Sequence, residues 1–247
     1  MIERIIQAFH PNEGDELVDS KLNYFDSTGS NMLPLISIVI PVFNEAILLP
    51  HTLDSIDANP DEKEIIVVDG GSTDGTQECA KQRGAMLISS PVLNRAQQMN
   101  LGAQAATGDV LLFLHADTLL PQTALQEIRR VLLEEKIVGG AFSRNYDHPS
   151  LFLRTTCLLA SIRSRWLGWY FGDQGIFVRT CIFKEIWGFR NVEKFEDLEF
   201  SRSLRSFGHT VTLNPYILSS GRRFGQYPIR RTLKDVLLTL KYLRSKR

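Results

Sequence analysis

The stretch Ile36-Ser-Ile-Val-Ile-Pro-Val42 decides the class of fold. β-Branched residues dominate it and Pro41 stands near its end, so the pattern predicts a short strand that is buried on both faces. A second run of this kind, Glu64-Ile-Ile-Val-Val68, follows after residues 45–56, which have the spacing of a helix. Buried strands joined by helices are typical of a mostly parallel sheet covered by helices on both faces. We therefore expect an α/β fold.

The same alternation continues toward the C-terminus. Further strands are expected over residues 85–88, 110–114, 137–142 and 175–178. Further helices are expected over residues 76–83, 96–106, 151–167, 180–186 and 197–207, and one is expected to open at Pro121. Ligands bind beyond the carboxyl ends of the strands in sheets of this type. The polar residues that follow these strands are therefore the candidates for a functional site.

The composition excludes several classes of protein. The 247 residues carry 28 basic and 28 acidic side chains and are 43% hydrophobic, which is typical of a globular chain with no general affinity for nucleic acid. The three cysteines, Cys79, Cys157 and Cys181, are too far apart for a CxxC pair, which argues against a disulfide framework or a zinc site. The sequence shows neither a signal peptide nor a spanning segment, so a cytoplasmic protein is expected.

Charge divides the chain into three expected parts. Residues 1–34 are acidic and are expected to form a poorly ordered leader, and residues 35–225 form the main domain. Residues 226–247 are expected to form a basic amphipathic helix. One face of that helix would carry Ile229, Leu233, Val236, Leu237, Leu240 and Leu243. Such a helix can lie on an anionic membrane surface through residues 229–247, or it can pack on the domain or on a second subunit.

Four segments follow expected strands or open an expected helix, and each carries residues suited to chemistry. In Pro41-Val-Phe-Asn-Glu45, Phe43 can stack on a flat base, although Glu45 can equally be a helix-capping acid. Asp69 precedes glycines that let backbone amides approach a ligand, and the stretch is not the GxGxxG of dinucleotide-binding folds. Asp117 can hold Mg²⁺ or Mn²⁺ or can cap a helix. Glu196 and Asp197 stand at a helix start, where the helix dipole also favours acids.

Taken together, these segments resemble the family 2 glycosyltransferases over residues 35–225. The order of IPVFNE, VVDGGSTDGT, the strand with HAD and the Glu-Asp pair carries the resemblance. It is closest to a small bacterial subgroup in which His115-Ala-Asp-Thr118 replaces the usual DxD and Gly172-Asp-Gln174 precedes Phe177-Val-Arg179. The resemblance implies a GT-A fold, with a Rossmann-like sheet.

The resemblance also implies roles for individual residues. Pro41, Phe43 and Glu45 would line the nucleotide pocket, Asp69 would bind the base or ribose, and Arg95 would lie near the phosphates. Asp117 would hold the metal ion. His115 stands where many relatives have the first Asp of DxD, and it would either bind the ion or support its ligands, while Gly70 stands where many relatives have a second acid. Asp197 would be the general base, with Glu196 beside it. Asp173, Gln174, Arg222 and Arg223 would face the acceptor or the transferred sugar.

These roles imply an enzyme of the hexosyltransferase class that inverts the anomeric centre. Its donor would be a nucleoside-diphosphate sugar, most simply a UDP-sugar, its cofactor Mn²⁺ or Mg²⁺, and its acceptor a hydroxyl compound that many relatives carry on a lipid. An acceptor of that kind would bring the protein to the inner face of the cell membrane. Two alternatives remain open from the sequence. One is a non-catalytic nucleotide-sugar-binding module, and the other is a sugar-nucleotide pyrophosphorylase.

Overall fold

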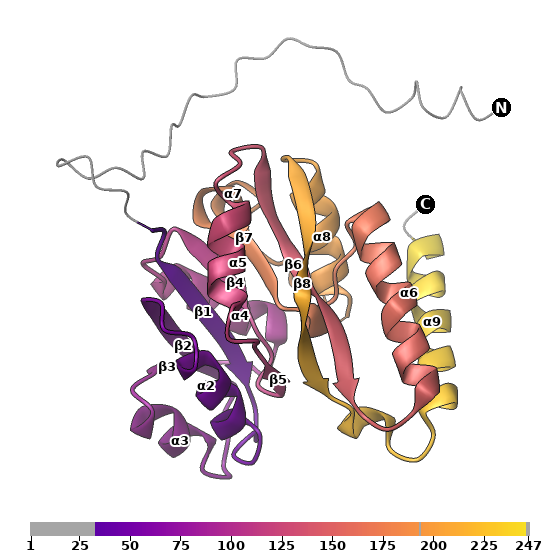
Figure 1. The fold of residues 1–247 in the computed structure, drawn as a ribbon. Helices are drawn as coiled ribbons and strands as arrows, with labels where there is room; N and C mark the ends of the chain where they lie inside the picture. Colours follow the sequence, from indigo (N-terminus) through magenta and orange to yellow (C-terminus); the bar gives the residue numbers. More distant parts are fainter. Residues whose placement is uncertain (1–32, 193, 246–247) are drawn as a thin grey trace. The chain divides into compact units, whose positions relative to one another are not determined.

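A computed structural model of the chain describes residues 33–192 and 194–245. The acidic leader expected over residues 1–34 lies almost entirely outside these residues, as do the last two positions of the expected C-terminal helix. Within residues 34–245 the chain forms one compact unit built on a single mixed sheet (Figure 1). The expected α/β fold is confirmed.

The sheet has eight strands in the order β3-β2-β1-β4-β7-β6-β8-β5. Their bounds are β1 Ile36–Val42, β2 Lys63–Asp69, β3 Met86–Ser89, β4 Val110–Phe113, β5 Thr118–Leu119, β6 Ile137–Asp147, β7 Ile176–Arg179 and β8 His209–Ser220. The pairs β1–β2, β2–β3, β1–β4 and β6–β8 are parallel, whereas β7 runs antiparallel to both β4 and β6. The sheet is therefore mostly parallel, as the alternation of strands and helices predicts.

Helices cover the sheet on both faces. Their bounds are α2 Leu49–Asp57, α3 Thr76–Gln82, α4 Arg95–Ala105, α5 Ala124–Val131, α6 Leu151–Leu167, α7 Thr180–Glu185, α8 Glu196–Arg205 and α9 Pro228–Ser245, with short 3₁₀ turns η2 at Gly172–Gln174 and η3 at Arg222–Phe224. Side chains alternate across a strand, so β1 sends Ile38 and Ile40 into one buried cluster and Val39 into the other. The helix α4 approaches β1 closely, because a Cβ added at Gly102 would lie 2.4 Å from Cγ1 of Val39.

Two helices begin later than expected. The helix expected from Glu45 begins at Leu49, after a turn in which the Glu45 carbonyl accepts from the amides of Leu48 and Leu49. The helix expected to open at Pro121 begins at Ala124, whose amide donates to the Pro121 carbonyl across a turn. Both helices are therefore entered through an extra turn that amphipathic spacing does not reveal.

The second half of the sheet is larger than expected. The strand β6 runs on to Asp147 instead of ending near Phe142, and β8 was not expected at all. Pro215 lies within β8, and a proline in a run argues against a strand interior. Ser143 to Asp147 are mostly polar, so no hydrophobic run marks them as a strand. The C-terminal parts of these two strands bring Arg144, Tyr146, Ser219 and Ser220 to the wall of the pocket described below.

The helix α9 covers residues 228–245, close to the expected amphipathic helix, and lies beside α6 (Figure 1). Among the helices of the described residues, none has the length and hydropathy that crossing a membrane requires.

Candidate active site

A pocket of about 1290 Å³ opens where β1 and β4 end. It is lined on one side by the segment after β1 and the start of α4, and on the other by β6, η2, α8 and η3. Eleven of the residues expected at the site line it: Pro41, Phe43, Glu45, Arg95, His115, Asp117, Asp173, Glu196, Asp197, Arg222 and Arg223. The fold thus gathers in one place residues that the sequence separates by up to 182 positions (from 41 to 223).

Asp69 lies beneath the pocket wall and is fully buried. Its Oδ2 accepts hydrogen bonds from the amides of Gly71 and Ser72, both at 2.9 Å, and from the Gln77 amide group at 2.8 Å. Its other oxygen, Oδ1, has no hydrogen-bond partner among the described residues. The carboxylate therefore shapes the turn after β2 and keeps one acceptor uncommitted.

The loop after β1 is locked to the turn after β2. Asn44, in a left-handed conformation with φ 53°, donates its amide to Ser72 Oγ at 2.8 Å and accepts from the Thr73 amide at 3.0 Å. Beneath it, the buried Gln98 side chain donates to the carbonyls of Val42 and Val68, at 2.9 and 2.8 Å, and so ties the ends of β1 and β2 together. Neither Asn44 nor Gln98 was among the expected site residues. The hydrogen bonds of both residues hold the loop that carries Phe43 and Glu45.

Arg222 bridges two acids, Glu45 and Asp117, that follow β1 and β4. Its guanidinium group hydrogen-bonds to Glu45 and lies 3.5 Å from Oδ2 of Asp117. Burial raises the pKa of Asp117, and Arg222 acts in the opposite direction. Oε2 of Glu45 has no partner among the described residues. The sequence grouped Arg222 with the acceptor side, whereas here it contacts the acids expected on the donor side.

His115 is an uncharged lining residue. Burial, followed by the charge of Arg95, lowers its pKa to about 3, so the imidazole is neutral at physiological pH. Its Nε2 has no hydrogen-bond partner among the described residues and packs against Gly172, where an added Cβ would lie 2.5 Å from it. A side chain at position 172 would therefore collide with the ring.

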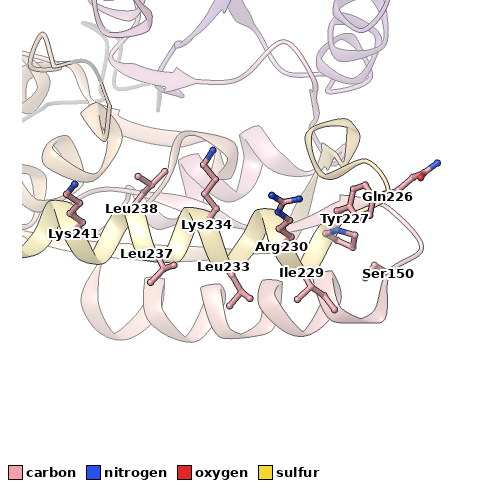
Figure 2. A pocket seen from close by; sticks show the side chains of 11 residues that line it. Ser150, Gln226, Tyr227, Ile229, Arg230, Leu233, Lys234, Leu237, Leu238 and Lys241 are labelled. Atoms are coloured by element: carbon pink, nitrogen blue, oxygen red, sulfur yellow. The ribbon is translucent and has the colours of Figure 1, made fainter.

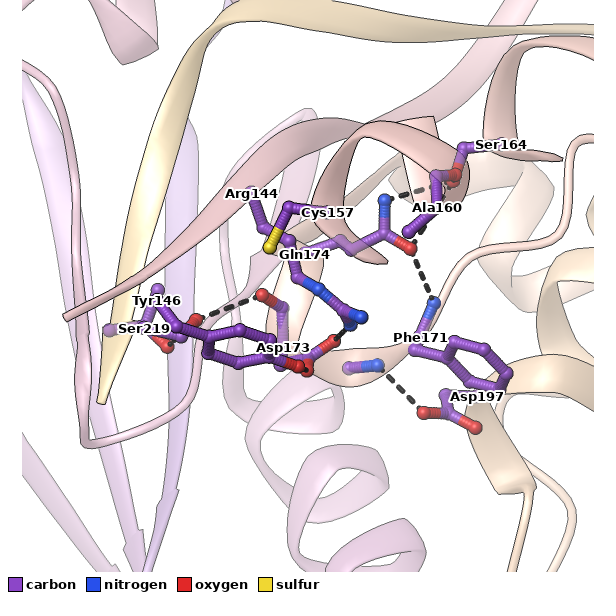
Figure 3. A network of polar contacts seen from close by, with 12 residues as sticks. Arg144, Tyr146, Cys157, Ala160, Ser164, Phe171, Asp173, Gln174, Asp197 and Ser219 are labelled. Atoms are coloured by element: carbon purple, nitrogen blue, oxygen red, sulfur yellow. Dashed lines mark hydrogen bonds and ion pairs between the residues drawn. The ribbon is translucent and has the colours of Figure 1, made fainter. Parts of the chain in front are cut away.

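Asp173 is held in a buried network of polar contacts with Arg144 and Tyr146 (Figure 3). It hydrogen-bonds to Arg144, accepts from the Tyr146 hydroxyl at 2.6 Å and lies 3.6 Å from Nη2 of Arg223. Burial alone would raise the pKa of Asp173, but Arg144 and Arg223 hold it well below its usual range. The carboxylate stays ionised and fixes both guanidinium groups at the edge of the pocket.

Gln174 is fully buried behind the pocket wall. Its amide nitrogen donates to the Phe142 carbonyl at 3.1 Å, and its Oε1 accepts from Arg163 at 3.0 Å and from the Phe171 amide at 3.1 Å. Among the described residues it connects β6, α6 and η2 instead of facing the cavity, in contrast to its neighbour Asp173. Burial lowers the pKa of Arg163 to about 10.

Asp197 stands at the start of α8 with its carboxylate fixed by two backbone amides. Oδ2 accepts a hydrogen bond from the Gly172 amide at 2.7 Å. Oδ1 accepts one from the Leu198 amide, also at 2.7 Å. Figure 3 shows Asp197 beside η2. Burial and the adjacent Glu196 raise the pKa of Asp197 to about 7, although the two amides act against this. Glu196 is buried and lies 3.7 Å from Arg95. The pair is therefore not a solvated helix start.

Sequence reasoning missed three residues of this wall: Arg144, Tyr146 and Arg163. Arg144 and Tyr146 are two positions apart in β6 and so point to the same face of the sheet. That period-2 signal was available, but the strand was expected to end before them. Arg163 lies on α6 with its guanidinium carbon 4.4 Å from the centre of the Phe171 ring, a contact that only the folded chain reveals.

Comparison with known families shows which family this chain belongs to. The sequence model of the family described as "Glycosyl transferase family 2" matches residues 37–187, more than half of the chain. The chain belongs to glycosyl transferase family 2. The matched range contains the segments after β1, β2 and β4 and the turn η2, whereas Asp197, Arg222 and Arg223 lie beyond it.

Named relatives of this family 2 chain are glycosyltransferases. The chain is 32% identical over 160 residues to a "PGL/p-HBAD biosynthesis glycosyltransferase" of Mycobacterium bovis, covering 62% of this chain and 58% of the relative. It is 30% identical over 160 residues to an "Undecaprenyl-phosphate 4-deoxy-4-formamido-L-arabinose transferase" of Aeromonas hydrophila, covering 60% of this chain and 49% of the relative. The matches thus span about half of the length of these relatives.

Solved structures share the fold at low sequence identity. A mannosyltransferase, PcManGT from Pyrobaculum calidifontis, in complex with GDP-Man and Mn2+, has a TM-score of 0.65 at 22% identity over 85% of this chain and 64% of its own. The S. aureus protein TarS 1-349, in complex with UDP-GlcNAc, has a TM-score of 0.60 at 15% identity over 76% of this chain and 58% of its own. This family 2 chain therefore has the GT-A fold.

The residues of this family 2 pocket fit a divalent ion that a ligand helps to hold. Among the described residues, no three His, Cys, Asp or Glu side chains converge into a complete metal site. Mg²⁺ and Mn²⁺, however, are often bound by one or two carboxylates together with substrate phosphates and water. Asp117 lines the pocket, and the uncommitted Oε2 of Glu45 offers a further oxygen nearby. These two carboxylates suit an ion that binds together with a diphosphate.

Proposed function

We propose that this chain is an inverting glycosyltransferase that moves a sugar from a nucleoside-diphosphate sugar to an acceptor hydroxyl, with Asp197 as the general base. The donor that we propose is a UDP-sugar. The observation that carries the proposal is the state of Asp197: a carboxylate in the pocket wall, oriented by two amides, with its pKa raised to about 7. A base catalyst is most effective when its pKa lies near the working pH.

The proposed reaction is a single displacement. The acceptor oxygen attacks the anomeric carbon, its proton passes to a carboxylate oxygen of Asp197, and the bond from the anomeric carbon to the phosphate oxygen breaks. The electron pair of that bond leaves with the nucleoside diphosphate. Because attack and departure occur on opposite faces of the sugar, one displacement inverts the anomeric centre. The proposal requires one base and no covalent nucleophile.

The donor side of the pocket supplies positive charge where the leaving group develops negative charge. The two cationic side chains of Arg95 and Arg222 line this side. Asp117 would hold Mn²⁺ or Mg²⁺, which would neutralise charge on the diphosphate. On binding of that diphosphate, Arg222 would exchange its contacts with Glu45 and Asp117 for phosphate oxygens. Such preorganised cations are an effective means of stabilising a leaving group.

Two other functions explain the site less well. A nucleotide-sugar-binding module needs no titrating carboxylate. The raised pKa of Asp197 lowers folding stability at neutral pH, and carboxylates perturbed in this way are typical of catalytic sites. A sugar-nucleotide pyrophosphorylase usually carries a glycine-rich stretch with Arg or Lys directly after the first strand. Here that position holds Pro41 to Glu45, with no basic residue. Transfer is therefore the function that we propose.

For the acceptor we propose a hydroxyl compound carried on a lipid. The support comes from a relative whose name specifies an undecaprenyl-phosphate substrate. A lipid-linked acceptor would require the enzyme to work at a membrane surface, on its cytoplasmic side, with residues 229–247 as the expected contact.

The proposal is tested with Asp197→Asn, which keeps the size of the side chain and removes the base. We expect it to lower the rate of sugar transfer, or of donor hydrolysis when water is the acceptor, by about 100-fold or more. UDP binding measured by calorimetry should be unchanged, because Asp197 does not belong to the donor side. Glu134→Gln, at an exposed acid remote from the pocket, is the matched control. Near-normal turnover of Asp197→Asn would exclude the assignment of the base.

A further inference from the structure

The helix α9 is attached to the domain by its polar side. Its half-buried positions are Pro228, Thr232, Asp235, Thr239, Tyr242 and Leu243. They recur every three or four residues and so form the stripe that faces the domain, and most of them are polar. Tyr242 anchors this stripe, because its hydroxyl donates to Glu199 at 2.9 Å and its ring lies 4.7 Å from that of Phe195.

Most of the large apolar side chains of α9 lie outside this stripe and are exposed, and two of them, Val236 and Leu240, also line the candidate active site. Leu233 is 56% exposed and Leu237 66%, and Ile229, Val236 and Leu240 are exposed as well. Figure 2 shows Ile229, Leu233 and Leu237 in a row along the helix, beside a shallow pocket of about 840 Å³. An amphipathic helix on a water-soluble domain normally buries its apolar stripe. The arrangement here is the reverse, which leaves the apolar stripe for something other than this domain.

The neighbouring helix α6 shows the same feature. Its buried stripe consists of Leu153, Cys157, Ala160 and Ser164. Large apolar side chains nevertheless stand on its outer side, with Leu158 63% exposed and Trp166 77% exposed. Two adjacent helices that both expose apolar stripes form a patch larger than scattered surface leucines would give.

The charges around these stripes have one sign. The exposed charged residues of α6 and α9 are Arg154, Arg165, Arg230, Arg231, Lys234, Lys241 and Arg244. Within residues 151–167 and 228–245 the acid is Asp235, and it lies on the half-buried polar stripe. A surface with this composition is complementary to an anionic, apolar medium. A second copy of the chain would instead bring seven further exposed cations against these seven.

The patch is also continuous with the candidate active site. Leu159 and Arg163 of α6 and Val236, Thr239 and Leu240 of α9 line the same pocket as Asp197 and Arg223. An acceptor that approaches along these two helices would therefore reach the base without passing through bulk water.

We propose that the outer faces of α6 and α9 form a docking surface for an anionic lipid bilayer, which places the mouth of the pocket at the membrane. The docking itself is independent of the reaction, whereas its purpose, delivery of a lipid-linked acceptor to Asp197, rests on the proposed function. The basic residues engage the headgroups, and Leu233, Leu237 and Trp166 enter the boundary of the acyl chains.

The test is flotation of the full chain with vesicles of phosphatidylcholine alone or mixed with phosphatidylglycerol, at low and at high salt. We expect binding to the mixed vesicles, weakened by salt because exposed charges are screened. Replacing both leucines, in Leu233→Glu/Leu237→Glu, should lower the binding constant by about 100-fold or more, since each exposed leucine contributes roughly tenfold. Leu133→Glu, which replaces another exposed leucine outside the two helices, should bind as the parent does.

A second measurement follows the insertion of Trp166. Its fluorescence should shift to the blue on mixed vesicles, and the shift should be absent in Trp166→Phe, which retains Trp169 and Trp187. Equal binding of both vesicle types, or of the double variant and the parent, would overturn the proposal. So would a dimer in light scattering that the double variant abolishes while mixed vesicles bind nothing. UDP binding by the same variants is the separate check on the proposed function, because it does not depend on lipid.

Discussion

At the residue scale, Asp197 is the most informative side chain. It faces the cavity, yet burial and Glu196 oppose its ionisation, and two amide hydrogen bonds at 2.7 Å offset this only in part. A structural acid at a helix start would have its pKa lowered by the dipole and by such hydrogen bonds. The sequence could predict that Asp197 belongs to the site, but not the direction of its pKa shift, which depends on burial.

The raised pKa predicts how activity changes with pH. The proposed base, Asp197, would act as a carboxylate, so kcat should rise with pH through about 7 and then reach a plateau. Stability should change in the opposite direction. The folded state holds the proton more tightly than the unfolded state, so this contribution is present at acidic pH and is lost as pH rises through about 7.

The measurements are a pH–rate profile of the parent and urea unfolding of the parent and Asp197→Asn at pH 8. The variant should be at least as stable as the parent at that pH, because it has no charge to bury. A flat pH–rate profile across the range around 7 would contradict the assignment of Asp197 as the group that titrates.

At the scale of elements, prediction succeeded where hydrophobic runs are long and failed where polar residues form strands. The first four strands, at 36–42, 64–68, 85–88 and 110–114, agree with β1 to β4 within a few residues. The end of β6 was missed because Ser143 to Asp147 are mostly polar, and β8 was missed because Pro215 interrupts it. Arg144, one of the two arginines beside Asp173, was therefore missed, because it lies in the unexpected part of β6.

The pairing of β6 with β8 predicts a position that tolerates no side chain. A Cβ added at Gly140 would lie 2.0 Å from the carbonyl oxygen of Val211, a backbone atom that cannot rotate away. We expect Gly140→Ala to lower the free energy of unfolding by about 3 kcal/mol. Gly84→Ala is the control, because it has open space and costs only the strain of a positive φ, about 1 kcal/mol. Urea titrations in which both variants lose equal stability would show that β6 and β8 are not so closely paired.

At the scale of the whole molecule, the site is an assembly of distant segments, and the sequence predicted its membership better than its geometry. The expected residues after β1 and β4 line one pocket because the carboxyl ends of these parallel strands share one edge of the sheet, and Asp197 joins them from the start of α8. Chain order gave no indication that Gln174 turns inward, that Asp69 lies beneath the wall, or that Arg222 reaches Glu45 across the pocket. Those placements depend on packing between elements far apart in sequence.

Binding of UDP, the product that the proposed sugar donor would leave, should stabilise the whole domain. A ligand that binds only the folded state, present at about 100 times its dissociation constant, adds roughly 2.7 kcal/mol, which corresponds to a rise in Tm of roughly 5–10 °C for a chain of this size. We expect UDP with Mn²⁺ to raise Tm by about this much in a thermal-shift experiment, and UDP with a chelator to do less. In Asp117→Ala, Mn²⁺ should add little to the effect of UDP. An unchanged response to the ion in that variant would exclude Asp117 as its ligand.

The attachment of α9 through a polar stripe has a consequence for local opening. Residues 228–245 line the pocket yet contain no fully buried side chain, so little apolar area is exposed to water when they separate from the domain. The free energy of that separation is then a small part of the free energy of global unfolding, which resides in the clusters on either side of the sheet. We expect α9, which forms one wall of the cavity, to separate from the domain while the sheet stays folded. A bulky amphiphilic ligand would then enter and leave the cavity between α9 and the domain.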